Sequence, residues 1–131
     1  MKIEKLLMAG LGGFFGAALR YLISEMTSKS LGSFPLGTLI VNIVGSFLMG
    51  FLMEGSADLW NISAETRIFL TTGILGGLTT FSTFSYETVS FLSEGKLLMG
   101  GLNAALNLFL ALLACSAGEA AVRMLKGTPI L

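Results

Sequence analysis

The sequence of 131 residues contains no histidine, only one cysteine and two prolines. Without histidine the chain cannot build an imidazole metal site or a Ser-His or Cys-His catalytic pair. The single cysteine, Cys115, excludes a disulfide framework within one chain. No nucleophile–base pair and no cluster of metal-ligating side chains is visible in the sequence. We therefore expect a protein that is not an enzyme.

Charged residues are equally scarce, at 12 % of the chain. A soluble domain usually carries about 25 % charged residues, because charge covers its surface. Eight Lys/Arg and eight Asp/Glu give a net charge of zero, which provides no footprint for nucleic acid. Disorder is excluded because 53 % of the residues are hydrophobic. The remaining class is an integral membrane protein, with residues 1–131 forming a single domain.

Long uncharged runs predict four membrane-spanning helices. Lys29 and Glu54 are separated by 24 uncharged residues, and Lys96 and Glu119 by 22. Both runs exceed the roughly 20 apolar residues that a spanning helix needs. The third run is of marginal length for a spanning helix. The first run is long enough to cross the membrane only if Arg20 is tolerated near its end. We predict an all-α fold with helices at about 4–25, 34–54, 64–92 and 97–125.

Positive charges are divided almost evenly between the two sides of such a protein. With the N-terminus in the cytoplasm, five Lys/Arg residues lie inside and three outside. The positive-inside rule needs a clearer difference to set one orientation. Two interpretations stay open, since the difference either suffices for one orientation or the chain inserts both ways.

Glycine is abundant, with 17 residues. Glycines at three positions interrupt the first run, so we expect a retained spanning helix rather than a cleaved signal peptide. Small residues four apart allow helix backbones to approach closely in lipid. Such pairs are Gly12 and Gly16, Gly73 and Gly77, and Ser46 and Gly50.

The stretch from Gly73 to Ser85 lies within the third predicted span, yet it is rich in Gly, Thr and Ser. The adjacent Gly76 and Gly77 weaken a helix, and the adjacent Thr79 and Thr80 can bond to their own backbone. We predict a broken helix here rather than a continuous one. Carbonyls freed by a break are good ligands for Na⁺, and half-helix N-termini attract anions.

Other residues in the spans allow two interpretations each. Phe81 and Phe84 lie on one helix face, where they either pack or offer positive ring edges to an anion. The amides of Asn42, Asn103 and Asn107 either bond between helices or line a permeation path.

Two charged residues lie close to predicted spans. Arg20 is expected to extend its guanidinium to the membrane interface. Glu87 is expected to be a solvated or Arg-paired carboxylate.

The segment Gly76-Gly-Leu-Thr-Thr-Phe-Ser-Thr-Phe-Ser85, followed by Glu87, resembles the signature of the CrcB/Fluc fluoride channels. The similarity continues with Gly16-Ala-Ala-Leu-Arg20 in the first span, and with Gly37-Thr-Leu-Ile-Val-Asn42 and Gly45 in the second. These motifs occur in the expected order in three of four spans. The resemblance extends over essentially the whole chain.

The resemblance implies an antiparallel, dual-topology homodimer in a bacterial inner membrane, which conducts fluoride passively through two pores and rejects chloride. It assigns Phe81 and Phe84 to the lining of the ion path, together with Asn42, Ser82 and Thr83. It places Arg20 and Thr38 near an aqueous vestibule. It also assigns the carbonyls of Gly76 and Thr79 to a structural Na⁺ at the dimer interface.

In the fourth span the chain departs from the family pattern. Asn103 and Asn107 occupy the polar track there, and the next position is Ala111. We expect both amides to line the fluoride path.

Two other functions compete with the channel. A small four-helix, dual-topology drug/proton antiporter needs a membrane-buried carboxylate. No acidic residue lies between Glu4 and Glu25 in the first span. A non-transporting membrane scaffold would explain the glycine pairs but not the hydroxyl-rich third span.

Overall fold

The computed structural model describes residues 2–29 and 32–129, and every regular element in these ranges is helical. In chain order the elements are α1 (Ile3–Thr27), α2 (Leu36–Asp58), α3 (Ala64–Ile68), η1 (Phe69–Leu75), α4 (Gly76–Leu78), α5 (Phe81–Ser93) and α6 (Leu97–Lys126). Among the described residues, four helical stretches are long and apolar enough to cross a membrane. This confirms the four predicted spans, although α2 continues to Asp58 rather than ending near residue 54.

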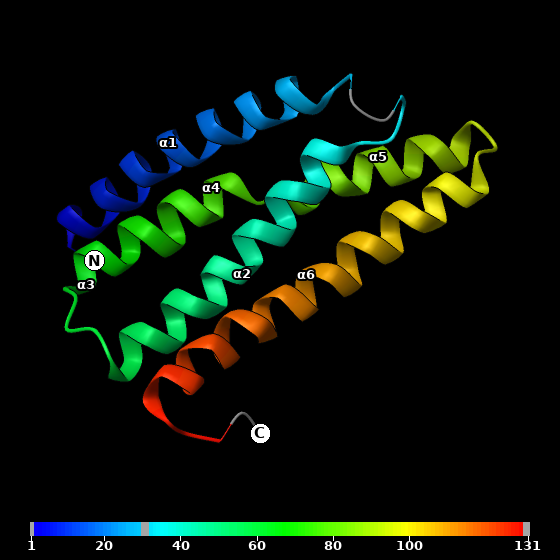
Figure 1. Ribbon diagram of the computed structural model, residues 1–131. Helices are drawn as coiled ribbons and strands as arrows, with labels where there is room; N and C mark the ends of the chain where they lie inside the picture. The colour runs from blue at the N-terminus through cyan, green and yellow to red at the C-terminus, as the bar shows by residue number, and fades with distance from the viewer. Residues whose placement is uncertain (1, 30–31, 130–131) are drawn as a thin grey trace.

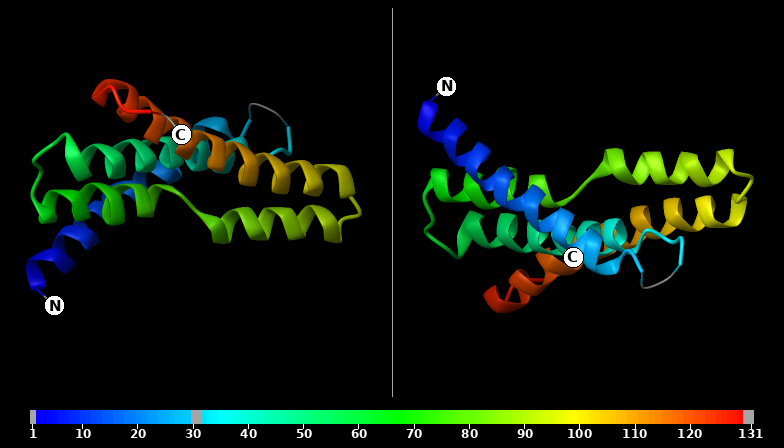
Figure 2. Two further views of the ribbon diagram at one scale, coloured as in Figure 1. Left: turned by 90° about the horizontal axis from the view of Figure 1, so that it is seen from below. Right: turned by 90° about the horizontal axis from the view of Figure 1, so that it is seen from above.

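The third span is interrupted, as predicted, but the position of the break differs from that of the glycines. Gly76 and Gly77 are helical and belong to α4. The backbone becomes extended at Thr79 (φ −78°, ψ 153°) and Thr80 (φ −150°, ψ 117°). β-Branched residues favour this conformation, and the Thr80 hydroxyl accepts from the Thr83 N–H, which the break leaves without its helical acceptor. Figure 2 shows the extended segment and the sideways offset of α5 from α4.

The two halves of the third span pack against different helices (Figure 1). Before the break, η1 and α4 lie along α1. After it, α5 lies along α6, which also packs against α2 over much of its length. The segment η1 is π-helical, a wider helix that is often found near functional sites. The break therefore lets one span connect α1 with α6.

Small residues bring the helix backbones close together, as the sequence predicts. A Cβ atom at Gly16 would overlap the carbonyl oxygen of Ile74, and one at Gly50 would overlap that of Cys115. On the other side of the second contact, a Cβ at Gly118 would overlap the carbonyl oxygen of Phe47. These glycines thus fix the distances between α1 and η1 and between α2 and α6.

Charged residues join the last turns of α2 and α6 at one end of the bundle. The Lys126 ammonium lies 3.2 Å from Glu54 Oε1 and 3.0 Å from Asp58 Oδ2. Arg123 Nε lies 3.2 Å from the same Glu54 oxygen. The ion pairs hold the two helix ends together, beyond the apolar part of the bundle.

Candidate functional site

The break at Thr79 and Thr80 is the centre of the candidate site, and the side chain of Asn42 on α2 holds it in place. The Thr80 N–H donates to Asn42 Oδ1 at 2.8 Å, and Asn42 Nδ2 donates to the Thr80 carbonyl at 3.2 Å. The carboxamide thus replaces, for Thr80, the backbone partners that a continuous helix would provide. Because Thr80 is buried, leaving these groups unpaired would be costly.

Carbonyl oxygens beside the break lose their helical donors to side chains. In a continuous helix Gly76 would bond to the N–H of Thr80, which here donates to Asn42. Thr79 would bond to the N–H of Thr83, which here donates to Thr80 Oγ1 at 3.1 Å. Both carbonyls belong to residues that the family resemblance assigns to a Na⁺ site, and carbonyl oxygen is a ligand type that Na⁺ accepts. The donor set therefore fits a hard monovalent cation.

Arg20 does not extend to the membrane interface as expected. Its Nε donates to the Gly77 carbonyl at 3.1 Å, the last carbonyl but one before the break. The same side chain borders a small cavity with Thr38, Thr80 and Thr83. The freed helix-end carbonyl attracts the guanidinium, because helix C-termini carry partial negative charge. The structure thus places Arg20, Thr38 and Thr83 together.

A larger groove of about 520 Å³ runs along the other side of the break. Asn42, Phe81, Phe84 and Asn107 all border it, so four of the predicted path residues meet at one surface. The two rings lie edge to face, with centroids 5.2 Å apart and planes at 70°. Phe81 is 78 % exposed, so most of its ring is accessible at the mouth of the groove.

Three predicted path residues do not border this groove, and one of them, Thr83, borders the smaller cavity beside Arg20. Ser82 is exposed, with its hydroxyl 3.3 Å from Thr80 Oγ1. Asn103 is fully buried behind Asn107, and its Nδ2 donates to Thr88 Oγ1 at 3.0 Å. The amides of the second and fourth spans therefore bond to neighbouring groups within the chain, one of the two interpretations that the sequence left open.

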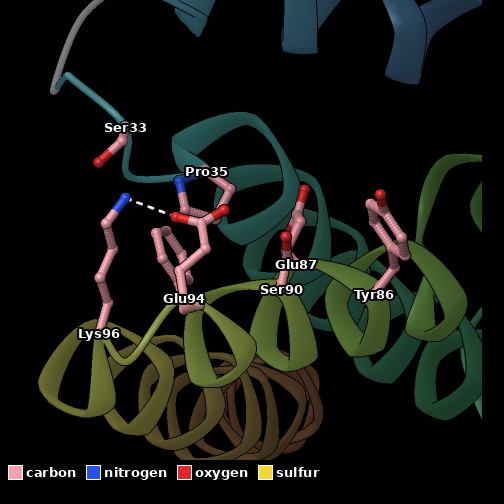
Figure 3. Close-up of a pocket in the computed structure, with 8 residues that line it drawn as sticks. Ser33, Pro35, Tyr86, Glu87, Ser90, Glu94 and Lys96 are labelled. Carbon is pink, nitrogen blue, oxygen red and sulfur yellow. Dashed lines mark hydrogen bonds and ion pairs between the residues drawn. The ribbon is translucent and has the colours of Figure 1, made fainter.

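Glu87 is neither well solvated nor paired with an arginine, which corrects the expectation from sequence. Its Oε1 accepts a hydrogen bond from the Thr38 hydroxyl at 2.6 Å, and among the described residues its buried Oε2 has no partner. Figure 3 shows the cavity of about 260 Å³ beside it, bordered by Glu94 and Lys96, which pair with each other. Sequence reasoning missed the Thr38–Glu87 contact, since the two residues are 49 positions apart.

Comparison with known proteins identifies the family of this chain. The profile of the family described as "CrcB-like protein, Camphor Resistance (CrcB)" matches residues 7–119. The chain belongs to the CrcB family. With its four apolar helices, this CrcB-family member is a multi-pass membrane protein.

Several relatives of this CrcB-family member carry the name "Fluoride-specific ion channel FluC". The protein of that name from Clostridium novyi is 59 % identical over 122 residues, which cover 90 % of this chain and 95 % of the relative. One from Clostridium perfringens is 54 % identical over 127 residues, or 94 % and 99 % of the two chains. One from Methanococcus maripaludis is 50 % identical over 107 residues, or 82 % and 86 %.

Proposed function

We propose that this protein is a fluoride channel, and not an enzyme, which lets cytoplasmic fluoride leave a bacterial cell passively across the inner membrane. The observation that carries this function is the groove at the helix break, where Asn42, Phe81 and Phe84 meet. The names of the FluC relatives support the choice of ion. Passive export down the electrochemical gradient would reduce fluoride toxicity.

The chemistry of the groove suits a small, strongly hydrated anion. A narrow path for such an ion must replace its water with hydrogen-bond donors and positive ring edges. Phe81 and Phe84 supply the ring edges, and the Asn42 amide supplies polar character at the break. Asn107 continues the polar side of the groove, and the hydroxyls of Ser82 and Thr83 extend it around the N-terminus of α5. A chloride ion is larger and fits such a path poorly.

Anions reach the path through a vestibule formed by Arg20 and Thr38. The cavity that these residues border with Thr83 has a volume of about 240 Å³. The guanidinium brings positive charge to a region that otherwise contains hydroxyl groups. Attraction of anions to such a region raises their local concentration before they enter the pore.

Efflux from liposomes tests the proposed function. Purified protein in vesicles loaded with equal fluoride and chloride should release fluoride rapidly and retain chloride, as measured with ion-selective electrodes. Protein-free vesicles control for leak. Equal release of both anions, or of neither, would reject the channel, and exchange of a cationic dye driven by a pH gradient would indicate the antiporter instead.

The active unit is an antiparallel homodimer with two pores. The nearly even division of positive charge supports insertion in both orientations. The exposure of Phe81, which borders the groove, and of Gly76 near the break supports contact with a second copy, because both would otherwise face lipid. In this arrangement each break meets the break of the partner at the centre of the dimer.

Labelling of a single cysteine should reveal both orientations. Thr128 is exposed beyond the end of α6, so Thr128→Cys combined with Cys115→Ala places one accessible thiol at that end. An impermeant maleimide added to intact cells should label about half of the chains, and the rest only after permeabilisation, if insertion is dual. Labelling of all chains, or of none, from outside would contradict dual topology.

A Na⁺ ion at the dimer centre would be held by the carbonyls of Gly76 and Thr79, two from each subunit. The loss of their helical donors at the break supports this assignment. When bound, the ion would supply positive charge that links the two breaks. Because the ligands are backbone atoms, the identity of the Thr79 side chain matters less than its backbone conformation.

Replacing Na⁺ by a large organic cation throughout purification should therefore lower fluoride flux and the fraction of dimer. Both should recover when Na⁺ is added back, and Thr79→Ser should behave as the unaltered protein does. Flux and dimer content that stay undiminished after rigorous Na⁺ removal would rule out the site.

A further inference from the structure

Hydrogen bonds between three carboxamides form a chain from the helix break to the middle of α5. Asn42 Nδ2 donates to Asn107 Oδ1 at 2.8 Å. Asn107 Nδ2 donates to the carbonyl and Oδ1 of Asn103 at 3.0 and 3.1 Å. Asn103 Nδ2 donates to Thr88 Oγ1 at 3.0 Å. Asn42 thus donates both to the break and to Asn107, and the two later carboxamides donate onward, away from the break.

The backbone of Thr80 fixes that direction. The oxygen and nitrogen of a carboxamide are distinguished by their hydrogen-bond partners. Turning the Asn42 amide over would place its NH₂ against the Thr80 N–H and its oxygen against the Thr80 carbonyl, because both groups face this side chain. The Asn42 NH₂ group then faces Asn107 Oδ1, and the bonds from Asn107 Nδ2 to Asn103 hold that oxygen in place.

This series of hydrogen bonds links three helices in a closed circuit. It leaves the third span at Thr80, passes through α2 and α6, and returns to the same span at Thr88. The helix α5, which carries Phe81 and Phe84, is therefore held at its first residues and again two turns later. Asn103 and Asn107 are 0 % and 4 % exposed, so water cannot replace a bond lost from this circuit.

We infer that Asn103 and Asn107 are positioning residues, which hold Asn107 Oδ1 as the acceptor for the Asn42 carboxamide and hold α5, rather than bind the conducted ion. This inference rests on the proposed function only in the interpretation of the flux measurement. It rests on the hydrogen bonds alone for the coupling between Asn103 and Asn42, which share no contact of their own in the chain.

A side-chain NMR measurement tests the coupling directly. The sequence contains four asparagines, of which Asn61 lies outside the chain of amides in the α2–α3 connection. Selective ¹⁵N labelling of asparagine side chains in detergent-solubilised protein yields four NH₂ signals, assigned by single substitutions. In Asn103→Leu the signals of Asn107 and also Asn42 should shift and exchange faster with water, while the Asn61 signal stays in place. A purely local packing role of Asn103 would leave Asn42 unchanged.

Flux provides the second measurement. Asn103→Leu should lower fluoride flux about tenfold, because a buried amide that loses its partner must reorient or stay unsatisfied. Thr88→Val removes only the final acceptor and should shift the same NMR signals in the same direction by a smaller amount. This variant replaces Asn103→Leu in the test if Asn103→Leu does not fold. Asn61→Leu should leave flux and the other three signals unchanged.

The outcomes are decisive in each case. An Asn42 signal that does not respond in either variant overturns the inference, whatever the flux. A responding Asn42 signal with unaltered fluoride flux also overturns it, since the amides would then not position the path. Absence of fluoride flux in the unaltered protein would reject the proposed function, while the NMR result would still report the coupling.

Discussion

Phe84→Ile should fold and dimerise normally but lose most fluoride flux, by about tenfold or more. Isoleucine keeps a comparable apolar volume and removes the ring quadrupole, whose positive edge contacts the anion in the proposed path. A loss of ~1.4 kcal/mol of stabilisation along the path corresponds to a tenfold change in rate. The measurement is fluoride efflux from liposomes, with dimer content determined on the same preparation.

Milder substitutions at the same position supply the control. Phe84→Tyr and Phe84→Met keep a polarisable side chain of similar reach and should retain more flux than Phe84→Ile. The same order should hold at Phe81, whose ring meets that of Phe84 edge to face. If the rings only pack, isoleucine should be tolerated best and flux should follow dimer content. Full conduction by Phe81→Ile combined with Phe84→Ile would show that the rings do not line the path.

Gly16→Ala should destabilise the protein severely, although it adds only one methyl group. The new Cβ would overlap the Ile74 carbonyl oxygen, which is backbone and cannot move aside as a side chain can. Overpacking of this kind costs about 1–3 kcal/mol and sometimes more. The expected result is a lower unfolding temperature and a smaller yield of monodisperse protein in detergent.

Gly10→Ala is the matched control on the same helix. No atom lies within 4 Å of a Cβ at Gly10, and the residue is exposed on α1. Alanine is favoured over glycine within a helix by roughly 1 kcal/mol, so this variant should be as stable as the unaltered protein or more so. Equal damage from both substitutions would show that the α1–η1 approach does not set the stability.

The spans and the close helix contacts could be predicted from sequence because each depends on local features. Uncharged runs set the four helices, and Gly12 and Gly16 are spaced to face one neighbour. Helix ends were less predictable, because α2 continues to Asp58 through ion pairs with Lys126 on α6. The pair of Asp58 and Lys126 joins residues 68 positions apart, and no local sequence pattern reveals such a contact.

The break was predicted in the right stretch but for a reason that is only half correct. Gly76 and Gly77 have weak helix propensity, yet both remain helical, and a Cβ at Gly77 would crowd the backbone of α1 at Gly13. Close packing against α1 is the role of Gly77, whereas Gly76 is exposed and a Cβ there would meet no other span. The interruption occurs at Thr79 and Thr80, where Asn42 supplies the bonds that the extended backbone needs. That partner comes from another span and could not be located by propensity.

Prediction of the candidate site from sequence was limited in the same way, because partners on other spans could not be located. The family resemblance selected Phe81, Phe84, Asn42 and Asn107 as path residues, and the structure brings them to one groove. The sequence did not locate the partner of Arg20, and the surroundings of Glu87 were predicted wrongly. General rules send an arginine near a span end to the interface, but the Gly77 carbonyl freed near the break is a stronger local attraction.

The length of α6 has a consequence for the lipid environment of the bundle. Its 30 residues extend about 45 Å, well beyond a hydrocarbon layer of about 30 Å. The excess lies at the end that carries Arg123 and Lys126, where ion pairs to Glu54 and Asp58 already neutralise the charges. The hydrocarbon layer of a thicker bilayer can therefore cover more of this end of α6 without burying an unpaired charge. Hydrophobic mismatch is absorbed at the periphery of the bundle, while the broken span near the midplane keeps its geometry.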